Sequence, residues 1–147
     1  MDELLVKQMP HSAEAEQAVL GSMLIDSRCV AEVMGYLKPA DFYLTANREI
    51  FETISSMFNY SQPIDPVTLL EQMRLAGVYK DTSPNYLAEL MNITPTASNV
   101  MRYAAIVKDK SMLRAIAETA SDISAMVSDG TGSADDVLEA AERRIYA

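Results

Sequence analysis

The chain has 147 residues, a formal net charge of −9 at neutral pH and a single cysteine, Cys29. An acidic surface repels nucleic-acid phosphates on average, so we do not expect this domain to bind nucleic acid directly. One cysteine excludes an intramolecular disulfide, and no stretch approaches the roughly 20 apolar residues of a membrane span, so we expect a cytoplasmic protein without membrane contact.

The first elements are marked by helix start signals and apolar spacing. Residues 1–11 are expected to form an irregular arm, and Ser12 is a suitable N-cap for a helix over Ala13–Ile25. An i, i+3, i+4, i+7 pattern then predicts a second helix that ends at Lys38-Pro39, with the stripe Val30, Val33, Met34 and Leu37. A third helix should begin at Thr45 or Ala46, with the inward residues Ile50, Phe51, Ile54, Met57 and Phe58.

Proline marks the starts of the next two helices. Asp65 followed by Pro66 places an N-cap carboxylate before proline at the first helical position, and Gly77 can end that helix in the left-handed conformation. Its inward residues should be Val67, Leu70 and Met73. Ser83-Pro84 repeats the start signal before Tyr86, Leu87, Leu90 and Met91. Residues 12–96 are therefore predicted to form a compact bundle of about five short helices.

Residues 97–147 have the pattern of a helical hairpin. Neither Gly nor Pro occurs from Ala97 to Ser128, and the apolar residues of the second half of this stretch follow coiled-coil spacing: Leu113, Ile116, Ala120, Ile123 and Val127. A glycine-containing turn at 129–132 precedes a capping-box-like pair, Ser133 and Asp136. The last helix continues the spacing with Ala134, Leu138, Ala141 and Ile145. The predicted fold class is all-α, a short-helix bundle followed by a long antiparallel hairpin.

Two helices cannot cover all the apolar surface of such a hairpin, because each helix has more than one apolar flank. The residues that widen the flank of the long helix are Ala104, Ile106, Val107 and Ala117. Surplus apolar surface of this kind favours contact with a second copy or another protein. The spacing thus predicts a module for assembly.

Residues that could carry catalysis or bind a metal are few. The sequence has no phosphate-binding loop, and one histidine (His11) with one cysteine cannot build a usual zinc site. We favour a surface or capping role for His11 and a core-filling role for Cys29. The paired acids are better explained by helix dipoles or a polar flank than by acid–base catalysis; they are Glu14 and Glu16, Glu49 and Glu52, Asp135 and Asp136. A basic row is favoured as a solvated face over a contact for an acidic partner; it comprises Arg102, Lys108, Lys110 and Arg114.

The run from His11 to Asp26, HSAEAEQAVLGSMLID, resembles the opening of bacterial DnaB-type replicative DNA helicases. Further similar segments follow in the family's order: Asp41-Phe42-Tyr43, Ile50-Phe51, Pro63-Ile64-Asp65, 86–90, 94–100, 103–104, 106–107 and 139–145. The family usually has a Gly-Gly pair shortly before the Tyr-Leu-x-Glu-Leu segment, where this chain has 81–85, DTSPN.

The resemblance implies an N-terminal domain whose hairpins pair into dimers, with six subunits forming a collar as a trimer of dimers. It implies that the C-terminal domain of primase and a helicase loader dock on this collar. The parent would be an ATP-dependent 5′-to-3′ DNA helicase that uses ATP and Mg²⁺ in a C-terminal RecA-like ATPase domain. That domain is absent from this chain, so no cofactor and no catalytic or metal site is expected here.

The hypotheses name two sets of residues. For dimerisation through the hairpin they are Leu113, Ile116, Ile123, Val127, Leu138 and Ile145. For primase docking, carried over by the resemblance, they are Glu14, Tyr86, Ile116 and Ile123, for which packing or capping inside the domain is the competing explanation. The alternative function is a free-standing helical adaptor with the same fold, and a small enzyme is disfavoured because no convergent titratable groups are visible. Periodicity alone leaves the oligomeric state, the loader and the hairpin's orientation open.

Overall fold

The computed structural model describes residues 8–130 and 132–146. Residues 1–7 of the expected arm lie outside the described part, as do Thr131 of the expected turn and Ala147. The described residues contain α-helices and short 3-10 helices and no strand, so the predicted all-α class is confirmed. The chain divides into two compact units: a bundle unit, His11–Ser111, and a hairpin unit that holds Met112–Ala147 and the described residues of Met1–Pro10.

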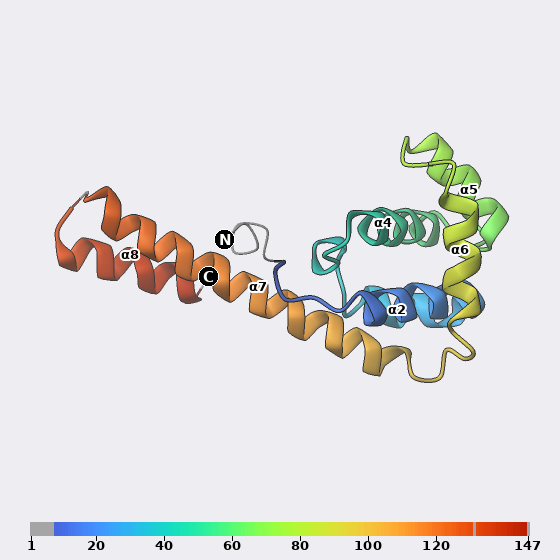
Figure 1. Ribbon diagram of the computed structural model, residues 1–147, viewed down its shortest axis with the longest axis horizontal. Coiled ribbons are helices and arrows are strands. Elements are labelled where there is room, and N and C mark those ends of the chain that lie inside the picture. The colour runs from blue at the N-terminus through green and yellow to red at the C-terminus, as the bar shows by residue number, and fades with distance from the viewer. Residues whose placement is uncertain (1–7, 131, 147) are drawn as a thin grey trace. The chain divides into compact units, whose positions relative to one another are not determined.

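The helices follow one another in the order that Figure 1 shows by colour. The α-helices are α2 (Ala13–Ile25), α3 (Val30–Met34), α4 (Thr45–Asn59), α5 (Pro66–Leu75), α6 (Ser83–Asn92), α7 (Val100–Asp129) and α8 (Ala134–Tyr146). The 3-10 helices are η1 (Ser27–Cys29) and η2 (Pro39–Asp41). Helix α7 contributes its first part to the bundle unit and its second part to the hairpin unit.

Local capping explains where several helices start. The Ser12 hydroxyl accepts a hydrogen bond from the Ala15 N–H at 3.1 Å, which confirms the predicted start of α2. The Asp65 carboxylate accepts from the Thr68 N–H at 2.9 Å, and Pro66 is the first residue of α5. Gly77 has φ of +79°, the left-handed conformation expected after that helix.

The predicted second helix is shorter than expected. The 3-10 turn η1 precedes it, and α3 ends at Met34 instead of continuing to Leu37. Lys38 has extended dihedrals, φ −122° and ψ 161°, because the ring of Pro39 disfavours helical geometry in the residue before it. Leu37 is nevertheless buried in the core.

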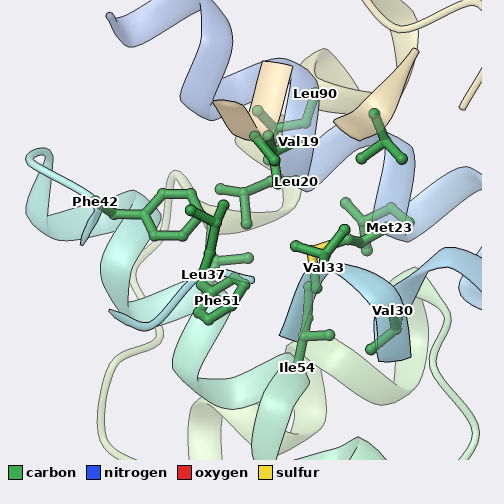
Figure 2. Close-up of a cluster of buried hydrophobic side chains, with 14 of the residues drawn as sticks. Val19, Leu20, Met23, Val30, Val33, Leu37, Phe42, Phe51, Ile54 and Leu90 are labelled. Atoms are coloured by element: carbon green, nitrogen blue, oxygen red, sulfur yellow. The ribbon is translucent and has the colours of Figure 1, made fainter. Parts of the chain in front are cut away.

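The core of the bundle is built from side chains of α2, α3, α4, α5, α6 and the first part of α7, and Figure 2 shows a cluster within it. The rings of Phe42 and Phe51 pack with centroids 4.7 Å apart. The other labelled side chains surround them or continue the same layer: Val19, Leu20, Met23, Val30, Val33, Leu37, Ile54 and Leu90. Every labelled residue is buried, so Phe51 and Ile54 of α4 face the core as predicted.

Four residues are oriented differently from the prediction. Val67 is 77% exposed, whereas Leu69 is fully buried. The other two predicted inward residues of α5, Leu70 and Met73, do pack against or within the core, so of the three only Val67 lies off the inward face. Phe58 is exposed near the end of α4. Ala104 and Val107 are buried in the bundle core instead of widening the hairpin's apolar flank.

Helices α2 and α6 approach closely at Gly21. A Cβ atom at this position would lie 2.1 Å from the Thr94 hydroxyl oxygen and 2.4 Å from the Leu90 carbonyl oxygen. The Thr94 hydroxyl donates to that same carbonyl at 2.8 Å, which holds it against α2. The absence of a side chain at Gly21 therefore sets the distance between these helices.

Candidate interaction surfaces

The hairpin unit is formed by the second part of α7 and by α8, which runs back beside it (Figure 1). An ion pair between Asp122 and Arg144 joins the two helices. At the turn, the Ser133 hydroxyl accepts from the Asp136 N–H, and the Asp136 carboxylate accepts from the Ser133 N–H, both at 3.2 Å. The predicted antiparallel hairpin and its capping box are thus confirmed.

Most of the hairpin's large apolar side chains are exposed within one chain. Those among the residues predicted for dimerisation are Leu113 (42%), Ile116 (62%), Val127 (65%), Leu138 (60%) and Ile145 (59%), and Met112 and Tyr146 are exposed as well. Ile123 is partly buried, and Ala141 is the buried residue of α8. The apolar side chains that follow coiled-coil spacing in the two helices of the hairpin therefore only partly cover one another.

Two largely apolar grooves run along the hairpin. One has a volume of about 490 Å³ and brings together Ile116, Ile123 and Ile145, with Arg144 at its rim. The other, near the turn, has a volume of about 460 Å³ and brings together Ile123, Val127 and Leu138. Five of the six residues predicted for dimerisation line one groove or both, and Leu113 lines neither.

The hairpin is acidic around these grooves. Residues 112–146 contain three arginines, Arg114, Arg143 and Arg144, against seven carboxylates. Arg114 donates to the Pro10 carbonyl at 2.8 Å, which ties a described residue of the N-terminal arm to α7. Lys108 pairs with Asp41 at 3.5 Å inside the bundle unit. The prediction that the basic row faces solvent is therefore wrong for Arg114 and Lys108, which both bind other parts of the chain.

A buried polar network lies in the bundle unit between α2, α4 and α6. The Glu16 carboxylate, 1% exposed, accepts from the N–H groups of Tyr43 at 2.7 Å and Leu44 at 3.3 Å and from the Asn47 amide at 2.9 Å. The Asn47 side-chain oxygen accepts from the Tyr86 hydroxyl. The interpretation of Glu16 as a helix-dipole acid was wrong: it is buried and binds the start of α4.

Tyr86 is partly buried beside this network. Its hydroxyl also accepts from the Gln17 amide at 3.5 Å, and burial raises its pKa, so the hydroxyl keeps its proton and donates it to Asn47. Of the other residues considered for docking, Glu14 is exposed on α2 in the same unit, whereas Ile116 and Ile123 share a groove of the hairpin unit. Sequence reasoning missed Asn47, although its spacing of three and four residues before Ile50 and Phe51 places it on the inward face of α4.

His11 and Cys29, the two residues considered for reactive chemistry, each pack against other side chains. The His11 ring stacks on Tyr43 with centroids 4.4 Å apart. Burial, reinforced by the charge of Asp26, raises the pKa of the Cys29 thiol to about 11, and Cys29 packs against the core. Within residues 8–130 and 132–146, no three His, Cys, Asp or Glu side chains gather as a metal site would need. No described helix is both long and apolar enough to cross a bilayer.

Comparison with known proteins identifies the family. Residues 8–109 match the family described as DnaB-like helicase N terminal domain. Replicative DNA helicases DnaB are similar over nearly the whole chain: 38% identity over 94% of it for Pasteurella multocida (strain Pm70), and 35% over 99% for Geobacillus stearothermophilus. The chain spans 30% and 32% of the lengths of these two relatives.

Solved structures agree with this relationship. The N-terminal domain of DnaB helicase from Mycobacterium tuberculosis matches 95% of this chain and 99% of its own, with a TM-score of 0.88 and 31% identity. The corresponding domain from Helicobacter pylori matches 77% of this chain and 89% of its own, with a TM-score of 0.68; at 24% identity it supports the fold alone. The chain therefore belongs to the DnaB-like helicase N-terminal domain family.

Proposed function

We propose that this chain is the oligomerisation and partner-docking domain of a replicative DNA helicase. The observation that carries the proposal is the exposed apolar surface of the hairpin, where five large side chains and two grooves are uncovered within one chain. Patches of this kind on soluble domains mark interaction sites. The family's helicase relatives, about three times as long as this chain, support the wider context.

The occupant of the hairpin surface is a second copy of the same hairpin. Apolar knobs such as Ile116 and Leu138 lie beside grooves that they can fill across a two-fold axis, where each copy gives and receives the same contacts. Three such dimers would form the hexameric collar. ATP and Mg²⁺ would be bound, and duplex DNA unwound, by the RecA-like domain of the longer protein, since this sequence has no phosphate-binding loop.

Sedimentation of the 147-residue chain over a range of concentrations tests the pairing. Ile116→Asp should weaken association by about tenfold or more, because burial of an isoleucine contributes about 1.5–3 kcal/mol and a carboxylate cannot replace it. Ser121→Asp is the matched control, since Ser121 is exposed on the same helix and lines neither groove. Equal association of the two variants would contradict hairpin pairing.

Primase is the proposed docking partner, and a helicase loader would share the collar. The Helicobacter pylori domain has been described together with its interactions with primase, and the membership of this chain in the DnaB-like helicase N-terminal domain family is what motivates the same role here. Tyr86, partly buried on α6 with its hydroxyl against Gln17 of α2, is the proposed anchor, and Glu14, Ile116 and Ile123 are further candidates. Titration of cognate primase should give about tenfold or more weaker binding to Tyr86→Ala, as expected for an aromatic hot spot. Unchanged affinity would remove Tyr86 from the docking surface.

A further inference from the structure

The Glu16–Asn47–Tyr86 chain of hydrogen bonds has a direction. A carboxylate that accepts every bond it makes requires a donor from each neighbour, so the Asn47 amide nitrogen must face Glu16. The Asn47 oxygen must then face the other way, where the Tyr86 hydroxyl donates to it. The opposite orientation of the amide would place its oxygen against the carboxylate.

The Glu16 end of this series of hydrogen bonds is held in place by several contacts. Glu16 is held by two backbone N–H groups just before the start of α4, and Asn47 is fully buried in the first turn of the same helix. Charged and neutral polar groups removed from water are retained in one geometry because a lost partner is costly. The Tyr86 hydroxyl is therefore anchored to a fixed point inside the bundle, while Gln17 of α2 donates to it from the other side.

We propose that Asn47 is a positioning residue for primase docking, which holds the Tyr86 side chain in the orientation that the partner recognises. The inference rests on the proposed docking function of Tyr86. Pre-organised aromatic side chains bind more tightly because their rotamer entropy is lost before the partner arrives. Asn47 itself is buried and is not expected to touch primase.

A double-mutant cycle separates positioning from a general effect on folding. Asn47→Ala should weaken the binding of cognate primase by roughly fivefold, the fold-change that corresponds to one hydrogen bond. In a Tyr86→Ala background the same substitution should have no further effect, because the residue through which it acts is gone. An equal loss in both backgrounds would overturn the proposal.

Tyr86→Phe provides a second test that keeps the ring and removes only the anchored hydroxyl. It should weaken primase binding by a similar factor while circular dichroism remains that of the unsubstituted chain, so the test does not depend on Asn47→Ala folding. Unchanged binding of Tyr86→Phe, beside weakened binding of Tyr86→Ala, would show that the ring needs no anchor and would refute the positioning role.

A probe on the tyrosine distinguishes failure of the inference from failure of the docking function. With 3-fluorotyrosine at position 86, the ¹⁹F resonance of the free chain should shift or broaden in Asn47→Ala and remain unchanged in Ser55→Ala, a control on the same helix. An unaltered resonance in Asn47→Ala would refute the positioning role of Asn47, whatever the affinity of the variants for primase. A different outcome is an altered resonance in Asn47→Ala together with unchanged primase affinity of Tyr86→Ala. That result would refute the proposed docking function of Tyr86, on which the inference rests.

Discussion

The close approach of α2 and α6 at Gly21 makes a strong prediction about stability. In Gly21→Ala the new methyl group would lie 2.1 Å from the Thr94 hydroxyl oxygen and 2.4 Å from the Leu90 carbonyl oxygen, well inside van der Waals contact. The hydroxyl belongs to a side chain, but the carbonyl belongs to the backbone of α6, so relief requires the two helices to move apart. Such overpacking costs about 1–3 kcal/mol.

The higher helix propensity of alanine opposes this cost, but its contribution is smaller. Alanine is favoured over glycine inside a helix by about 1 kcal/mol, which offsets part of the clash. Separation of the helices would also loosen the layer of Leu20, Met23 and Leu90. We therefore expect Gly21→Ala to lower the free energy of unfolding by about 1–2 kcal/mol, measured by urea denaturation with two-state analysis.

Two further variants make the test specific. Gly35→Ala is the matched control: Gly35 has helical dihedrals, φ −72° and ψ −14°, and a Cβ there would meet no atom nearer than 3.5 Å, so stability should be unchanged or slightly higher. Thr94→Ala should relieve Gly21→Ala only in part, because the Leu90 carbonyl remains. If Gly21→Ala is as stable as Gly35→Ala, the helices are not held at the distance described.

Three other outcomes follow from particular contacts. The Ser55 hydroxyl is buried without a hydrogen-bond partner within the described residues, so Ser55→Ala should preserve the free energy of unfolding or raise it by up to about 1 kcal/mol in urea denaturation; a loss would imply an unseen partner. Because its pKa is raised to about 11, Cys29 holds less thiolate at pH 8 in the folded chain, so iodoacetamide should label it more slowly than in urea-unfolded chain, and equal rates would contradict its burial. With seven carboxylates against three arginines per hairpin, paired hairpins repel electrostatically, so sedimentation should show tighter association in about 0.5 M than in about 0.05 M NaCl; weaker association in high salt would indicate that ion pairs hold the dimer instead.

The grooves and the network were foreseen to different degrees. Coiled-coil spacing identified Ile116, Ile123 and Leu138 as hairpin residues with too little cover, because a sequence period reports which side chains share a helix face. The roles of Glu16 and Asn47 were not foreseen. Their partners come from other helices, and an acid in a first helical turn is equally consistent with a surface position.

Local signals by themselves determined the helical class and most helix ends. Ser12, Asp65-Pro66 and the Ser133–Asp136 pair act through hydrogen bonds and dihedral preferences within a few residues, so their effect is readable from the chain. Only tertiary packing decided that Leu69 and not Val67 faces the core, and that Gly21 marks a helix crossing. These outcomes depend on which helix faces which, and that choice is made by contacts between residues far apart in sequence.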